Sequence, residues 1–138
     1  MGRSAGGARA VAGYDEDTVT MAVAAANDCL GRGGAKTDGL FLATTTAPYK
    51  EKQSAAIIAS AVDLPEECRT ADFTNTLRST TIALAAAMDA VKAGASKNII
   101  VTASDCRPGA ASVRYARYEN CSHNQRFQSG CARSLSGP

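Results

Sequence analysis

The first place in this sequence where chemistry could be expected is a sharp turn in the middle of the chain. The stretch "TADFTNTLRSTTIAL", residues 70–84, has the pattern of a short strand that breaks at Asn75 and continues at once as a helix rich in small residues. Such strand-to-helix turns often present a nucleophile at the positive N-terminal end of the helix. The residue at the tip is Leu77, whose side chain cannot act as a nucleophile. The turn therefore has the architecture of a site without its reactive group.

Hydroxyl groups surround the tip, on Thr74, Thr76 and Ser79. A hydroxyl becomes a useful nucleophile only beside a base, and no His or carboxylate partner for these groups is visible in the sequence. We expect Asp72, on the strand before the tip, to hold a loop or a helix end in place rather than to act as a base. The alternative interpretation is an ordinary helix N-terminus with Asn75 or Thr76 as its cap, and we favour it with respect to activity.

The five cysteines offer a second set of candidates: Cys29, Cys68, Cys106, Cys121 and Cys131. None forms a C-x-x-C pair and the N-terminus is a poor secretory signal, so we expect free thiols in a reducing compartment and a cytoplasmic protein. Cys106 would be a reactive thiol if it is exposed. A zinc site at Cys121, His123 and Cys131 is the other alternative. Because its spacing is not standard and a fourth ligand is missing, we expect no metal.

Composition limits the classes of function. The 138 residues are enough for one domain, and the 45% hydrophobic content argues against disorder of the whole chain. The longest apolar runs are far too short to span a bilayer, so no membrane partner is expected. Residues 107–138 hold five Arg and one Glu, whereas residues 1–106 hold 10 basic and 12 acidic residues. This basic segment could contact nucleic acid, but we favour a solvated, disordered or non-native tail and expect no nucleic-acid partner.

Elements that would position these residues follow from the hydrophobic patterning. Helices and strands alternate along the chain: a helix from near Asp15 to the "GRGG" at 31–34, a strand over 39–46, a helix over 50–64, a strand over 69–75, a helix over 78–94 and a strand over 97–105. This order predicts an α/β fold with a small, mostly parallel sheet. We expect three segments: a loose N-terminus over 1–13, an α/β body over 14–106 and the tail over 107–138.

Two predictions concern individual helices. Leu84, Met88 and Val91 recur at helical spacing and are predicted to form the apolar face of the third helix, with Gly94 as its stop. The segment Tyr49–Lys52 could line a phosphate-binding entrance, but we favour a solvated first turn of the second helix.

Four segments resemble the thiolase superfamily, and within it the hydroxymethylglutaryl-CoA synthase branch. In chain order they are "YDEDTVTMAVAAANDCL", "DGLFLATTTAPYKEKQSAAIIASAVDL", "TADFTNTLRSTTIALAAAMDAVKAG" and "KNIIVTASDCRPG", and together they cover about residues 11–109. The resemblance implies a thiolase-like half-domain that lacks the first strand and the second half of the family fold.

The family mechanism implied by this resemblance begins with a Cys at the start of the helix, which attacks an acyl-CoA thioester. A Glu at the end of the preceding strand acts as acid and base, and a His comes from the second half. In this sequence Leu77 takes the Cys position and Thr45 the Glu position. No catalytic residue is therefore assigned. The substrate-site outline consists of Thr45, Asn75, Thr76, Leu77, Arg78 and Ser79, with a coenzyme A thioester as the family substrate and no cofactor.

The expected function follows from this comparison. The family reaction is acyl-CoA acyltransfer and condensation, and we expect no independent catalysis from this chain. The alternative is a non-catalytic assembly or scaffold subunit. The strand before the nucleophile pairs across the dimer in the family, so Arg69–Asn75 is the candidate edge for a homodimer or hetero-oligomer. An Arg-rich binding tail on an inert domain ranks last.

Resemblance, hydrophobic periodicity and charge balance all change near Arg107–Pro108. We therefore hypothesise a truncated reading with a change of frame there. Translation of the parent nucleotide sequence in the other two frames tests this hypothesis, because one of them should restore a thiolase-like continuation.

Overall fold

The computed structural model describes residues 15–31 and 36–106, which form three helices and three strands in alternating order. The elements are α1 (Thr18–Gly31), β1 (Gly39–Ala43), α2 (Ser54–Ala61), β2 (Arg69–Phe73), α3 (Ser79–Lys92) and β3 (Ile99–Ala103). The predictions for the N-terminal segment, for the tail, for the frame change and for a zinc site at Cys121, His123 and Cys131 fall outside these residues.

The three strands form one parallel sheet in the order β2-β1-β3. All five residues of β1 are buried, as expected of a central strand that is covered on both faces. The prediction of a small, mostly parallel sheet in an α/β fold is therefore confirmed.

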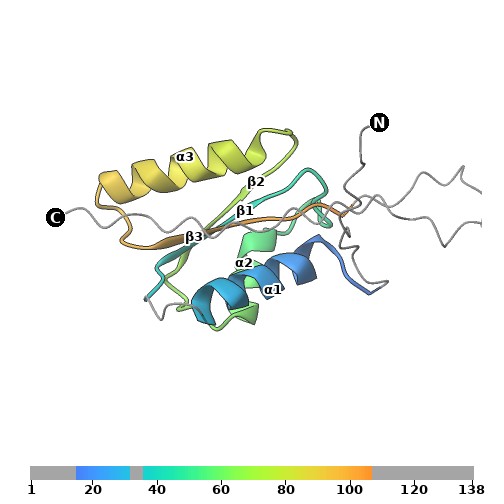
Figure 1. The fold of residues 1–138 in the computed structure, drawn as a ribbon, viewed down its shortest axis with the longest axis horizontal. Helices are drawn as coiled ribbons and strands as arrows, with labels where there is room; N and C mark the ends of the chain where they lie inside the picture. Colours follow the sequence, from blue (N-terminus) through green and yellow to red (C-terminus); the bar gives the residue numbers. More distant parts are fainter. Residues whose placement is uncertain (1–14, 32–35, 107–138) are drawn as a thin grey trace, which may run out of the picture.

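Helices cover both faces of this sheet (Figure 1). Successive side chains of β1 point to opposite faces, because a strand has a period of two. Leu40 and Leu42 pack in one core cluster with α1 and α2, and Phe41 and Ala43 pack in a second cluster with α3. The fold therefore has three layers, and β1 lies between the two cores.

The α1 helix begins three residues later than predicted, because Asp17 caps it. The Asp17 Oδ1 accepts a hydrogen bond from the Thr20 N–H at 2.8 Å, and the Thr20 Oγ1 accepts one from the Asp17 N–H at 2.7 Å. This reciprocal pair is a capping box, which fixes the first turn at Thr18.

The α3 helix ends as predicted but buries a different face. Gly94 has a φ of +71°, and the Ala95 and Gly94 N–H groups donate to the Ala90 and Val91 carbonyls, as in a Schellman motif. The residues of α3 that are buried are the small ones, Ser79, Ala83 and Ala87.

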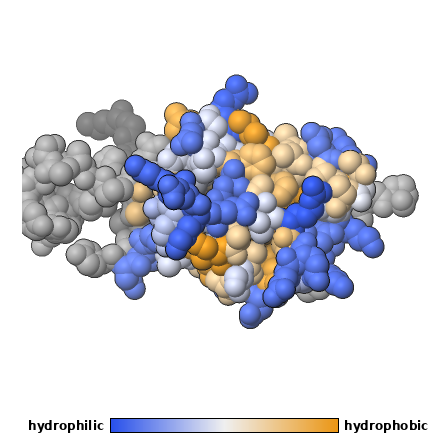
Figure 2. Space-filling model, turned by 180° about the vertical axis from the view of Figure 1, so that it is seen from behind, coloured by the Kyte–Doolittle hydropathy of each residue, from blue (hydrophilic) through white to orange (hydrophobic). Residues whose placement is uncertain are grey.

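The prediction that Met88 belongs to the buried face of α3 is wrong, since its side chain is 47% exposed, while Leu84 and Val91 are half-buried. Small side chains allow the helix to lie close to the sheet, and the larger ones are therefore displaced toward its flanks. Figure 2 shows apolar areas between hydrophilic ones on the surface seen from behind.

The remaining elements are shorter than predicted. The α2 helix begins at Ser54, so Tyr49–Lys52 precedes it and is not its first turn. The Lys52 Nζ lies 5.5 Å from the centroid of the Tyr49 ring, within the range of a cation–π contact. No helix in the described part of the chain combines the length and apolarity that a bilayer crossing requires.

Candidate functional site

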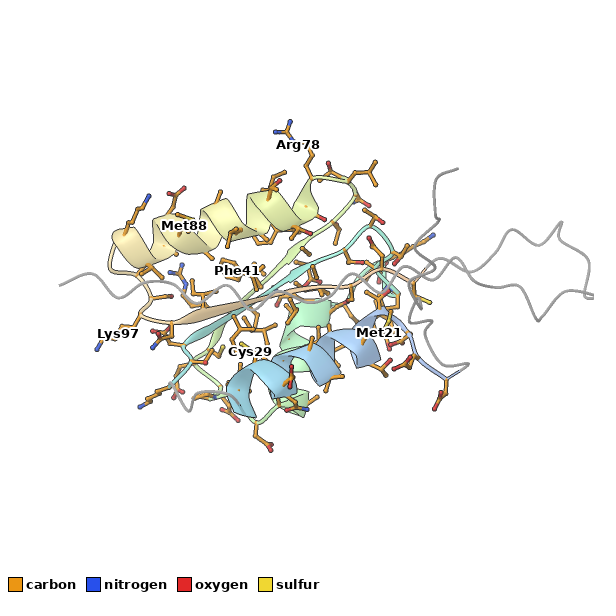
Figure 3. The ribbon with its side chains drawn as sticks, in the orientation of Figure 1. Met21, Cys29, Phe41, Arg78, Met88 and Lys97 are labelled. Atoms are coloured by element: carbon orange, nitrogen blue, oxygen red, sulfur yellow. The ribbon has the colours of Figure 1, made fainter. Side chains whose placement is uncertain are left out.

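The carboxyl ends of the three strands lie along one edge of the sheet, because parallel strands run in the same direction. Residues 44–46 follow β1, residues 74–78 follow β2 and residues 104–106 follow β3. Figure 3 shows Arg78 at this end of the molecule and Lys97 at the opposite end. Most functional crevices of open α/β sheets occur at the carboxyl edge.

The tip after β2 is a tight turn that carries an exposed leucine. Asn75 adopts a left-handed backbone with φ of +64°, a conformation that asparagine tolerates better than most residues. Leu77 follows with 82% of its side chain exposed. The Ser79 N–H donates to the Thr76 carbonyl at 3.1 Å, and α3 then begins. The sequence motif thus folds as the expected strand-to-helix turn.

The cap of α3 differs from the prediction that Asn75 or Thr76 caps this helix. The N-cap residue is Arg78, and its side chain makes no capping hydrogen bond. The Thr76 Oγ1 instead accepts a hydrogen bond from the Arg78 N–H at 3.2 Å, inside the turn itself. The turn is therefore closed by short-range contacts of Thr76, and the side chain of Leu77 at its apex points to solvent.

On the other side of this edge, Asp105 collects hydrogen bonds from three consecutive threonines. Its Oδ1 accepts from the Thr45 N–H at 2.6 Å and from the hydroxyls of Thr44 at 3.0 Å, Thr45 at 2.9 Å and Thr46 at 3.4 Å. We call these four residues the Asp105 cluster. They explain why β1 ends at Ala43, because the next residues turn their polar groups to Asp105.

Sequence reasoning missed Asp105. The signal that could have found it is that "TTT" and "SD" directly follow two apolar strands, whose carboxyl ends meet if the strands are neighbours in a parallel sheet. Nothing in the sequence says which strands are neighbours. The structure shows that Thr45 lies against a carboxylate, although it carries none itself.

The Asp105 cluster is also tied to α1. The Thr18 Oγ1 donates to the Thr46 carbonyl at 3.1 Å, and the Ser104 Oγ donates to the Thr18 carbonyl at 2.7 Å. The Cys106 N–H donates to the Thr46 Oγ1 at 2.9 Å. These links place the first turn of α1 beside the ends of β1 and β3 and so complete this side of the edge.

Asp72 has the structural role that the sequence predicted. Its two carboxylate oxygens accept hydrogen bonds from the N–H groups of Ser54 and Ala55, each at 2.7 Å. These are the first N–H groups of α2, where a negative charge is favourable. Asp72 therefore holds a helix end and is not placed as a base for the tip.

The cysteines differ from one another. Cys68 and Cys106 belong to no disulfide, as predicted, and both are half-buried, but Cys29 is disulfide-bonded, so the prediction of free thiols is wrong for that residue. Burial raises the pKa of the Cys68 thiol, and the negative charge of Asp38 raises that pKa further. Cys68 is thus poorly suited to act as a thiolate. No group of three or more potential metal ligands occurs within residues 15–31 and 36–106.

Comparison with known proteins places this edge in a family context. The chain is 31% identical over 104 residues to a hydroxymethylglutaryl-CoA synthase from Methanocella arvoryzae, a match that covers 74% of this chain and 30% of that enzyme. The chain thus spans about a third of the length of the curated relatives it matches. No family model matches the chain.

Solved structures agree with this match. MvaS in complex with 3-hydroxy-3-methylglutaryl coenzyme A is 28% identical, with a TM-score of 0.67, over 76% of this chain and 27% of that one. A 3-oxoacyl-(acyl-carrier-protein) synthase III is 21% identical with a TM-score of 0.65, over 70% of this chain and 30% of that one, and it supports the fold alone.

Proposed function

Because the chain belongs to the thiolase superfamily, on its hydroxymethylglutaryl-CoA synthase branch, we propose that its carboxyl edge is the outline of an acyl-CoA condensing site that performs no acyl transfer. The substrate of the relatives is a coenzyme A thioester, and the family reaction is acyl transfer to a cysteine followed by condensation. In this chain the fold of the edge is retained and the reacting groups are different.

The observation that carries this proposal is Leu77. It occupies the tip of the strand-to-helix turn, where the resemblance places the family cysteine, and it is 82% exposed. An alkyl side chain cannot form a thioester or an ester, whatever its position. The neighbouring polar groups of Asn75, Thr76, Arg78 and Ser79 outline the site but include no thiol.

Thr45 supports the same conclusion. It stands where the resemblance places the family glutamate, and its hydroxyl bonds to Asp105 at 2.9 Å. A hydroxyl does not exchange a proton near neutral pH as a carboxylic acid does. Asp105 is a carboxylate in this region, but its Oδ1 is engaged by the Asp105 cluster and so is committed to holding the strand ends together.

The experiment is an incubation of the protein with acetyl-CoA, followed by intact-mass and peptide mass spectrometry. We expect no acyl adduct on residues 74–79 of the unaltered chain. The variant Leu77→Cys places a thiol at a helix N-terminus, which lowers a thiol pKa, so it should acquire an acetyl adduct at that position.

Leu77→Ala is the matched control and should remain unmodified, so that adducts on Cys68 or Cys106 are recognised as background. An adduct on Thr74, Thr76 or Ser79 of the unaltered chain would show that this turn undergoes acyl transfer and would overturn the proposal.

A second function, assembly without catalysis, is favoured by a different observation. β2 is an outer strand of the sheet, and its five residues are exposed or half-buried, whereas those of β1 are all buried. An outer strand with accessible backbone groups is a template for another strand. We therefore retain a homodimer or hetero-oligomer through Arg69–Asn75 as the alternative.

A further inference from the structure

Two sets of hydrogen bonds join the start of α2 to β2. In one set a side chain of β2 bonds to the backbone of α2, and in the other a side chain at the start of α2 bonds to β2. The carboxylate of Asp72 on β2 caps α2, as described above. In return, the Gln53 Nε2 donates to the Thr70 carbonyl at 2.9 Å, and the Thr70 Oγ1 donates to the Gln53 Oε1 at 2.9 Å. Gln53 is the N-cap residue of α2, but its side chain makes no capping hydrogen bond. Asp72 performs that function, which leaves the Gln53 amide available for the strand.

The Thr70 carbonyl belongs to the open edge of β2. In a parallel ladder, alternate residues direct both N–H and C=O groups toward the neighbouring strand. The Arg69 N–H donates to a carbonyl just before β1 at 3.0 Å, and the Phe73 carbonyl accepts from the Thr44 N–H at 3.0 Å. Arg69 and Phe73 therefore face β1, and the alternation turns the backbone groups of Thr70 and Asp72 outward. Gln53 thus occupies an acceptor that an added strand would need.

We propose that Gln53 is a removable cap on the open edge of β2, which a second copy of this chain must displace when the two β2 strands pair. This inference rests on the assembly function proposed above. A second copy is the fitting occupant because its own β2 presents the same outward N–H and C=O groups, and two such edges are complementary when they run antiparallel about a two-fold axis.

Competition at the Thr70 carbonyl determines the expected effect. In the isolated chain the carbonyl accepts the Gln53 amide; in the paired state it accepts an N–H of the incoming strand. On pairing, each copy gives up its bond between the Gln53 amide and the Thr70 carbonyl. Near the lower end of the usual range of hydrogen-bond energies, one such bond changes an equilibrium constant about threefold. Loss of both caps should therefore tighten the dimer about tenfold.

The test is sedimentation velocity over a concentration series on the full chain and three variants. Gln53→Ala removes both bonds to Thr70 and should lower the dimer dissociation constant about tenfold. Thr70→Val removes only the hydroxyl bond and leaves the carbonyl acceptor, so its effect should be in the same direction but smaller. Lys52→Ala removes the neighbouring exposed side chain, whose Nζ lies over the Tyr49 ring, and should leave the dimer dissociation constant unchanged.

Amide hydrogen exchange at Asp72 separates the outcomes, because its outward N–H becomes protected only when β2 is paired. The unaltered chain could dimerise with protection at Asp72 while Gln53→Ala leaves the dimer dissociation constant unchanged or raises it. In that case the proposal that Gln53 caps β2 is wrong and the assembly function stands. If neither the unaltered chain nor Gln53→Ala associates, the cap and the assembly function both fail. Thermal unfolding of each variant checks that it is folded. If Gln53→Ala does not fold, the dimer dissociation constant of Thr70→Val decides whether the cap exists.

Discussion

Asp105 joins the ends of two strands at the carboxyl edge. One of its oxygens accepts hydrogen bonds from three hydroxyls and one backbone N–H, all from the segment that follows β1. Hydrogen bonds to a charged acceptor are stronger than neutral ones, and buried donors that lose their acceptor are destabilising. The end of β1 is thereby fixed against the end of β3.

Replacement of this carboxylate should be measurable as a loss of stability. We expect Asp105→Ala to reduce the free energy of unfolding by about 2 kcal/mol, because the hydroxyl of Thr44, which is buried, loses its acceptor. Urea unfolding followed by circular dichroism measures this. Asp89→Ala, which removes an exposed carboxylate on α3, should change the free energy by less than about 0.5 kcal/mol. Equal effects of the two variants would contradict the role given to Asp105.

At the scale of elements, α2 depends on a residue from another element for its first turn. The helix has eight residues, which is too short to be stable alone, and its N-terminal N–H groups are satisfied by Asp72. The start of α2 is therefore set by β2 as well as by its own sequence.

The corresponding variant is Asp72→Ala, which should destabilise the fold by about 0.5–2 kcal/mol, the usual range for loss of a helix cap. Hydrogen exchange at the amides of Ser54 and Ala55 should accelerate as well. Asp72→Asn retains one acceptor oxygen and should have the smaller effect. If exchange at these two amides is unchanged in Asp72→Ala, the cap does not protect α2 in solution.

Element order and strand direction could be predicted from the sequence because they depend on local hydrophobic patterns. The continuous apolar run of β1 and the stop at Gly94 are examples. The buried face of α3 could not be predicted from the sequence, because the helical spacing of Leu84 and Met88 is equally compatible with a flank of the helix. The Asp105 cluster joins residues about 60 positions apart, and no local pattern encodes which strands are neighbours.

At the scale of the whole molecule, the sheet has an outer strand with outward backbone groups beside a helix that exposes Ile82 and Met88. Both features favour association, since an open edge accepts hydrogen bonds and exposed apolar side chains gain from burial. Neither feature requires a catalytic group. The proposed assembly function is therefore compatible with the absence of a cysteine at Leu77.

The prediction at this scale is a concentration-dependent dimer. Light scattering over a series from about 1 to 100 μM should show the apparent mass rise to twice that of the chain, because pairing of β2 is a bimolecular equilibrium. A constant monomer mass over the whole series would contradict the prediction. Growth into polydisperse aggregates without a discrete dimer would indicate unspecific pairing of the edge.

The exposure of Leu77 has a consequence for how this turn can be engineered. An apolar side chain that is 82% exposed contributes little to packing, so replacement there is close to neutral for folding. A nucleophilic side chain can therefore be introduced at this position by a single substitution without a compensating change in the core. The tip is thus a position where a new functional group can be grafted with little effect on the fold.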